Sequence, residues 1–373
     1  LNVAVGNYSL DALTSGDSNV GVGHNSLGAN NSGNRNTAIG DDALKAHTTG
    51  NNNVAVGYQA LLVDTTGAQN VAIGKGALEA NTTAADNTAV GADALTANTT
   101  GAGNVAVGKS ALAAHTTAEG NTAIGKAALA TITTVVRNTA VGFEALTAQT
   151  TGYNNTAIGY VAGKAMTEGY QNTLVGDRAG TALTTGDNNT AIGQHALKTA
   201  TTADANTAIG FDALTLNTSG QYNTALGAYA LDSNTEGLRN VGVGYTAGQG
   251  VTTGDDNVSM GYAALHTQST GSQSVAIGYA ALYAANSTNC IAIGYDSGRA
   301  GSPGGNITTE SNRIILGNNS HTSAHIKVDW TVSSDERDKA DITDFSHGLN
   351  YVNQLRPVNY VWDNRTDYED NVR

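Results

Sequence analysis

Ser334 and Lys339 lie five residues apart and could form a reactive pair if the lysine acted as a base. A serine hydroxyl is a weak nucleophile until a neighbouring base takes its proton, and a lysine can be that base when burial or a nearby cation lowers its pKa. Arg337 lies between them in the sequence and is such a cation. In most proteins, however, a serine and a lysine this close in sequence are solvated surface groups, so the pair alone does not establish a catalytic site.

The other polar residues do not match a metal or cofactor motif. The eight histidines show no spacing typical of zinc ligands, so we interpret them as loop residues. The acidic pair Asp41-Asp42 lacks the glycine and glutamate spacing of a calcium loop. The glycine pair in 21–23 is not followed by the helix pattern that nucleotide binding requires. We therefore expect no cofactor, no metal and no activity on an external substrate.

The composition indicates a thin, repetitive structure rather than thick globular cores. The 373 residues include 46 glycines but only two prolines, three phenylalanines and two methionines. The net charge of −13 disfavours wide contact with nucleic acid, which requires lysine and arginine against phosphates. No apolar stretch is long enough to span a bilayer, so we expect no membrane insertion. Because the chain begins with Leu1, we expect it to be a fragment of a longer protein.

A 17-residue repeat runs through most of the chain. The segment 36–40, Asn-Thr-Ala-Ile-Gly, returns at 53–57 and at 70–74 with valine as the only change of residue type. We number the positions of each coil 1 to 17 from the leading asparagine. Ser274 takes position 1 in the seventeenth coil, and Cys290 takes it one residue early in the eighteenth, where we interpret the thiol as a small tolerated side chain. The asparagines are Asn2, Asn19, Asn36, Asn53, Asn70, Asn87, Asn104, Asn121, Asn138, Asn155, Asn172, Asn189, Asn206, Asn223, Asn240 and Asn257.

This repeat predicts an all-β fold, a parallel β-roll or β-solenoid of 17-residue coils, because it is too short for a helix pair and begins with β-branched residues. We expect positions 1–4 to form a strand, the glycine at position 5 a bend, positions 6–9 a second short strand, and the Thr-Thr-Gly segment an outer loop. Eighteen coils would make a rod of roughly 85 Å. The asparagines would stack into a ladder of amides along it.

The first strand is apolar at successive positions, as in 54–56, so both of its faces favour burial. One face can look into the coil, and a threefold axis of identical chains would cover the other. A dimer or a flat sheet contact would also satisfy the pattern. Tyrosines after the bend glycine suit either a stacking surface for a glycan or receptor or, as we favour, a row that thickens the rod. They are Tyr58, Tyr160, Tyr245, Tyr262, Tyr279 and Tyr295.

The repeated Asn-Thr-Ala-Ile-Gly-x-x-Ala pattern resembles the head repeats of trimeric autotransporter adhesins, which implies a parallel β-roll with three chains around an axis. The repeats here have a longer Thr-Thr-Gly loop. We expect residues 1–300 to be the repetitive stalk and 301–333 a transition with a last strand near 313–317. A new domain should occupy 334–373, because 14 of its 40 residues are charged, against 35 of the preceding 333.

The run Ser-Asp-Glu-Arg-Asp-Lys at 334–339, followed by Leu-Arg-Pro-Val-Asn-Tyr-Val-Trp at 355–362, closely resembles the intramolecular chaperone domain of phage tailspikes, tail fibres and endosialidases. The resemblance implies the start of an α+β domain that trimerises the chains, guides folding of the fibre and is released by self-cleavage. It assigns Ser334 as the nucleophile, Lys339 as the general base, and a cut between Ser334 and Asp335. We expect the domain to continue past Arg373 and the cleavage to require its remainder.

The sequence therefore favours a structural protein, the shaft of a homotrimeric viral tail fibre on the virion, outside the cell. Its partners would be its own copies and a host receptor or glycan. A bacterial trimeric surface adhesin would share the stalk but end in a coiled coil and a membrane anchor. A tailspike that depolymerises host glycans would require an acidic pair in a groove, for which the regular coils offer no break.

Overall fold

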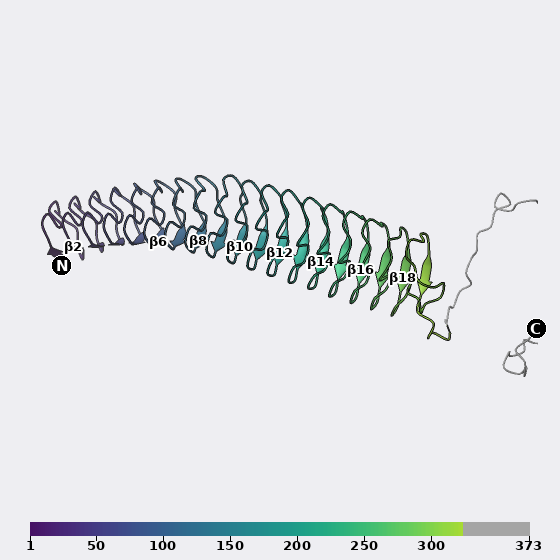
Figure 1. Cartoon of the computed structure of the whole chain (residues 1–373). Coiled ribbons are helices and arrows are strands. Elements are labelled where there is room, and N and C mark those ends of the chain that lie inside the picture. The colour runs from purple at the N-terminus through teal and green to yellow at the C-terminus, as the bar shows by residue number, and fades with distance from the viewer. Residues whose placement is uncertain (324–373) are drawn as a thin grey trace, which may run out of the picture. The chain divides into compact units, whose positions relative to one another are not determined.

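The computed structural model describes residues 1–323. Residues Leu1–Thr322 form one compact unit, which Figure 1 shows as a gently curved row of stacked coils. Every regular element in the described residues is a β-strand, and all 19 strands belong to one parallel sheet. The predicted parallel β-solenoid is therefore confirmed. Within residues 1–323, no helix has the length and apolar character needed to cross a membrane.

Each strand covers three residues, positions 2 to 4 of its coil, and pairs with the strand of the next coil. Val54 pairs with Val71, so the register equals one repeat. The strands are β1 (Val3–Val5), β2 (Val20–Val22), β3 (Thr37–Ile39), β4 (Val54–Val56), β5 (Val71–Ile73), β6 (Thr88–Val90), β7 (Val105–Val107), β8 (Thr122–Ile124), β9 (Thr139–Val141), β10 (Thr156–Ile158), β11 (Thr173–Val175), β12 (Thr190–Ile192), β13 (Thr207–Ile209), β14 (Thr224–Leu226), β15 (Val241–Val243), β16 (Val258–Met260), β17 (Val275–Ile277), β18 (Ile291–Ile293) and β19 (Ile314–Leu316).

The stacking continues where the repeat length changes. Val275 of β17 pairs with Ile291 of β18, although the coil between them is one residue short. Ile291 in turn pairs with Ile314 of β19, so the irregular segment between these strands closes one more coil. The last strand expected near 313–317 is thus confirmed as β19.

The bend at position 5 requires glycine for two reasons. Gly57 has a φ of +136°, a conformation that side-chain-bearing residues rarely adopt. A Cβ on Gly57 would also lie 2.6 Å from the carbonyl oxygen of Gly74, the bend glycine of the next coil. The predicted bend is confirmed, and the same glycine also permits close stacking of successive coils.

The second strand expected at positions 6–9 is wrong, because this segment is a turn. Gln59 and Leu61 have φ values of +57° and +52°, in the left-handed region that strands exclude. This backbone brings the consecutive residues Ala60 and Leu61 both into the core, whereas a strand would send them to opposite faces. The Leu61 N–H still donates to the Ala77 carbonyl of the next coil, 3.0 Å away, so the stack remains hydrogen-bonded here.

The predicted asparagine ladder is confirmed, and its geometry explains why position 1 is so regular. The backbone N–H of Asn70 donates to Oδ1 of Asn53 in the preceding coil, at 3.0 Å. The Nδ2 of Asn53 donates to the Gly67 carbonyl of its own coil, at 2.8 Å. Each side-chain amide thus makes one hydrogen bond to the next coil and one within its own coil. Cys290 sits at the end of the ladder as a buried free thiol, in agreement with its interpretation as a small tolerated residue.

Candidate functional site

The predicted site residues Ser334 and Lys339 lie outside the described residues. The structure therefore does not test their roles as nucleophile and base. Within residues 1–323, four features carry chemistry or surface character that a function could use: an apolar row, a tyrosine stack, a buried polar column and a cluster of charged groups with a groove nearby.

The outer face of the sheet carries an unbroken apolar row at position 4. Every described strand places valine, isoleucine, leucine or methionine at position 4. The side chains at positions 2 and 4 point outward, and the side chain at position 3, between them, faces the core. Position 2 beside this row is always valine, threonine or isoleucine, so no charged side chain interrupts the face. Ile209 is less exposed than the other larger members of the row between coils 3 and 18, which are 36% to 47% exposed: Ile39, Ile73, Ile124, Ile158, Ile192, Leu226, Met260, Ile277 and Ile293. A contiguous apolar surface of this length is typical of an interaction face.

A stack of tyrosine rings runs along position 6 of coils 15 to 18. The Tyr245 and Tyr262 ring centroids are 5.6 Å apart, and their planes differ by 14°. Tyr262 stacks on Tyr279 at 5.0 Å, and Tyr279 stacks on Tyr295 at 5.0 Å, with plane angles of 7° and 10°. All four side chains are about half exposed. The expected row of tyrosines is confirmed, and its members are in stacking contact.

A column of polar side chains runs through the interior at position 12 of coils 2 to 7. Its members have no exposed surface: Asn30, His47, Asp64, Asn81, Asn98 and His115. His47 and His115 lie in loop segments, as interpreted, but their side chains are buried in the interior, which the sequence analysis did not predict. The sequence did hold the signal, because His47 and His115 occupy the same repeat position as the asparagines and the aspartate between them.

Hydrogen bonds within the column distinguish its two histidines. His47 Nδ1 is 2.8 Å from a carboxylate oxygen of Asp64, and Asn81 donates to the other oxygen at 2.8 Å. His115 instead meets only neutral amides, Asn98 at 3.2 Å and Asn121 at 3.3 Å. Burial without a charged partner lowers the pKa of His115 to about 4. Because no member of the column is exposed, the column stabilises the coils and offers no access to a substrate.

One group of potential metal ligands occurs among the described residues, namely His24, Asp41 and Asp42 on the surface of coils 2 and 3. The His24 ring contacts Asp41 at 3.0 Å. Asp42 accepts a hydrogen bond from Asn25 and pairs with Lys45, and these two partners lower its pKa. The carboxylates are thus already engaged by protein groups in solvent, so we interpret the cluster as surface ion pairing.

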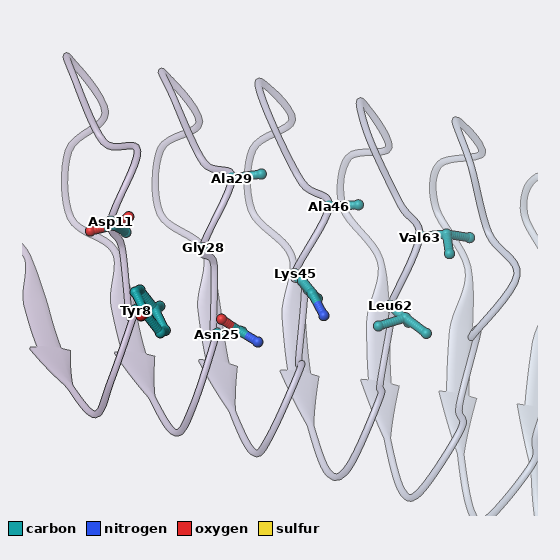
Figure 2. Close-up of a pocket in the computed structure, with 9 residues that line it drawn as sticks. All are labelled: Tyr8, Asp11, Asn25, Gly28, Ala29, Lys45, Ala46, Leu62 and Val63. Atoms are coloured by element: carbon teal, nitrogen blue, oxygen red, sulfur yellow. The ribbon is translucent and has the colours of Figure 1, made fainter.

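A shallow groove of about 580 Å³ lies over positions 7–11 of the first four coils (Figure 2). The groove forms where the side chains are small, as at Gly28 and Ala46. Its charged lining residues are one carboxylate, Asp11, and one ammonium group, Lys45. Glycoside hydrolysis requires two carboxylates across the scissile bond. The groove is lined by Tyr8, Asp11, Asn25, Gly28, Ala29, Lys45, Ala46, Leu62 and Val63, a set without that pair.

Comparison with known proteins identifies one segment. Residues 334–373 match the family described as chaperone of endosialidase, and the match starts at Ser334, where the resemblance in the sequence also starts. No curated protein and no solved structure matches the chain. The chain thus combines a parallel β-solenoid with a C-terminal segment of the chaperone-of-endosialidase family.

Proposed function

We propose that this chain is the shaft of a homotrimeric viral tail fibre that attaches to a host receptor or glycan. The observation that carries the proposal is the uninterrupted apolar row at position 4, which a single chain leaves exposed. Parallel copies around an axis place the same coil of each chain at the same height. The apolar row of one chain can then contact the apolar rows of the other chains along the whole solenoid. Closed symmetry of this kind is the usual arrangement of identical subunits.

The C-terminal segment supports the same proposal, because the matched family is named for a chaperone. A long stack of coils has a registration problem, since neighbouring copies can associate one coil out of step. A domain that first joins three chains at one end would fix their register. We assign Ser334 and Lys339 as the nucleophile and general base that release this domain once the fibre has formed, with the cut between Ser334 and Asp335.

A bacterial trimeric surface adhesin remains the second candidate, because its stalk would use the same apolar row. The chaperone-family segment favours the viral fibre, since an autotransporter would end in a coiled coil and a membrane anchor. The two are distinguished by where the protein is found. Antibodies against the solenoid should label virus particles by electron microscopy for the first candidate and intact bacterial surfaces for the second.

The direct test uses the full-length protein with its complete C-terminal domain. We expect light scattering to give the mass of a trimer and mass spectrometry to show loss of a C-terminal piece beginning at Asp335. Ser334→Ala should abolish the loss without preventing trimer formation, while Ser333→Ala, at the adjacent serine, should leave it unchanged. A monomer at all concentrations would contradict the fibre, and equal cleavage in the two variants would contradict the assigned nucleophile.

Attachment requires its own measurement. The purified fibre should bind intact host cells, and removal of surface glycans should reduce binding if the receptor is a glycan. A trimer that binds no cells would leave the shaft proposal in place and remove the attachment role from this part of the protein.

A further inference from the structure

We infer that the last coils of the solenoid form the primary contact between copies, through an apolar belt that is longer than any other in residues 1–323. The inference rests on the proposed homotrimer and specifies where its chains first meet. The belt consists of two rows on either side of the bend glycines of coils 15 to 18: position 4, with Val243, Met260, Ile277 and Ile293, and position 6, with Tyr245, Tyr262, Tyr279 and Tyr295.

Position 6 varies along the solenoid: aromatic residues occupy it singly in coils 4 and 13 and as the pair Phe143 and Tyr160 in coils 9 and 10, whereas the last four coils hold its longest unbroken aromatic run. In coils 5 to 8 three of the four residues at this position are exposed lysines, Lys75, Lys109 and Lys126. A lysine beside an apolar face keeps its ammonium group in water and suits the rim of an interface. In the last four coils tyrosine replaces these charges, so the apolar face extends around the bend. Tyrosine is also among the residues enriched at interfaces, whereas lysine is depleted.

The ring geometry favours a protein partner over a glycan. Tyr262 has one neighbouring ring on each side, at 5.6 Å and 5.0 Å, with plane angles of 14° and 7°. Its faces are therefore directed at other tyrosines, and Tyr279 is held in the same way. A sugar that stacks on an aromatic ring needs a free face, which the inner members of this stack do not offer. The ring edges and hydroxyls that remain exposed suit packing against side chains of a second copy.

The exposed area supports a second copy as the occupant. Full burial of an aliphatic side chain corresponds to roughly 60–120 Å² at 25 cal/mol/Å², so the partly exposed row at position 4 offers on the order of 500 Å². Four half-exposed tyrosines add on the order of 400 Å². A stable interface buries about 800 Å² on each partner. The row and the tyrosines together therefore offer an area of the same order as such an interface.

The position of the belt in the chain gives it a role in assembly. The chaperone-family segment begins at residue 334, shortly after β19 in the sequence. In chains that are joined by this segment, the belt coils are therefore the part of the solenoid that is nearest to the junction in sequence. Association that starts at the belt and proceeds toward coil 1 would keep the coils in register, because each paired coil fixes the height of the next.

The test compares two ring pairs with the same kind of stacking. Phe143 and Tyr160 stack at 5.4 Å with a plane angle of 13°, but outside the belt. In the full-length protein, Tyr262→Ser with Tyr279→Ser should raise the concentration at which half the chains are oligomeric by at least tenfold. The matched control, Phe143→Ser with Tyr160→Ser, should change it less than threefold. Sedimentation across a dilution series measures both, and circular dichroism verifies that the coils remain folded.

A second pair of variants keeps the inference testable if the serine variants unfold. Ile277→Thr with Ile293→Thr should weaken the oligomer more than Ile39→Thr with Ile73→Thr, although all four isoleucines are similarly exposed. Threonine is already present at position 2 of many strands and fits this sheet. Equal weakening at both ends would overturn the inference and leave the fibre proposal intact. A wild-type protein that stays monomeric would overturn both.

Discussion

His47 and Asp64 form a close contact inside the solenoid, with Nδ1 2.8 Å from Oδ2 and no exposed surface on either side chain. The other ring nitrogen of His47 is 2.8 Å from the Gly50 carbonyl oxygen, which can only accept a hydrogen bond. An N–H at Nε2 suits that carbonyl, and Nδ1 faces the carboxyl group of Asp64. The pair is a buried hydrogen-bonded contact between an imidazole and a carboxyl group within the column.

Removal of one partner of this pair should be more damaging than removal of both. We expect His47→Leu to lower the free energy of unfolding by about 3 kcal/mol, because it leaves a buried oxygen of the Asp64 carboxyl group without its hydrogen-bond partner. His47→Leu combined with Asp64→Leu should recover most of that loss. Apolar residues already occupy position 12 in other coils, for example Ile132 and Leu183, both fully buried. Urea unfolding of the single and double variants measures the difference, and a double variant less stable than the single one would contradict the pairing.

The second histidine of the column should make stability depend on pH. Burial lowers the pKa of His115 to about 4, whereas its pKa in the unfolded chain is near 6.5. Between these values the unfolded state binds the proton and the folded state does not. Stability should therefore fall as the pH drops from 6.5 to 4, by about 3 kcal/mol at most.

His115→Asn is the control for this pH dependence. Asparagine already occupies the same position in the preceding coil as Asn98, so the variant should fold and lose the contribution of the histidine. Urea midpoints of both proteins at pH 7.5, 6.0 and 4.5 give the comparison. Parallel pH profiles for the two proteins would show that His115 is not the titrating group.

The sequence was most informative where the same contact is repeated in every coil. The bend glycine and the ladder asparagine each make one interaction with the next coil, so a single requirement appears in many copies and can be recognised. The segment at positions 6–9 was misread because residues such as Gln59 and Leu61 rarely adopt left-handed backbone. Only the stacked coils enforce that conformation, and only some coils mark it with a glycine, such as Gly76.

Some residues of the candidate sites could likewise be identified from the sequence, and others could not. Ser334 and Lys339 were identified through a short motif, and their roles stay a prediction. The buried histidines were missed because position 12 is polar in coils 2 to 7 but changes between polar and apolar residues in the later coils. The polar members in coils 3 to 7 contact one another across coils, and the pattern becomes visible in the sequence when the repeats are aligned by position.

The asparagine ladder should tolerate serine better than alanine. Asn53→Ala leaves the Asn70 N–H and the Gly67 carbonyl without their partner, and we expect a loss of about 2–4 kcal/mol for two buried unpaired groups. Ser274 shows that serine can fill the position, because its hydroxyl contacts the Cys290 N–H at 3.2 Å and the Ser287 carbonyl at 3.3 Å. Asn53→Ser should therefore cost less than half as much. Equal losses in thermal or urea unfolding would indicate that the amide acts through size and not through hydrogen bonds.

The bend glycine should be the least replaceable residue of the coil. Gly57→Ala places a Cβ 2.6 Å from the Gly74 carbonyl oxygen and forces alanine to a φ of +136°. Backbone strain and overpacking each cost about 1–3 kcal/mol, so we expect a loss of about 3 kcal/mol. The control is Gly301→Ala, where an added Cβ meets no atom within 4 Å and the change should stay within about 0.5 kcal/mol.

Hydrogen exchange would locate the Gly57→Ala effect. The clash lies between two coils, so amides that bridge them should exchange faster, including the Gly74 N–H, which donates to the Val56 carbonyl at 2.8 Å. Amides many coils away should keep their protection, because each coil of a solenoid contacts only its neighbours. Loss of protection along the whole unit would instead mean that the stack unfolds as one cooperative block. In that case a single bend glycine would control the stability of every coil.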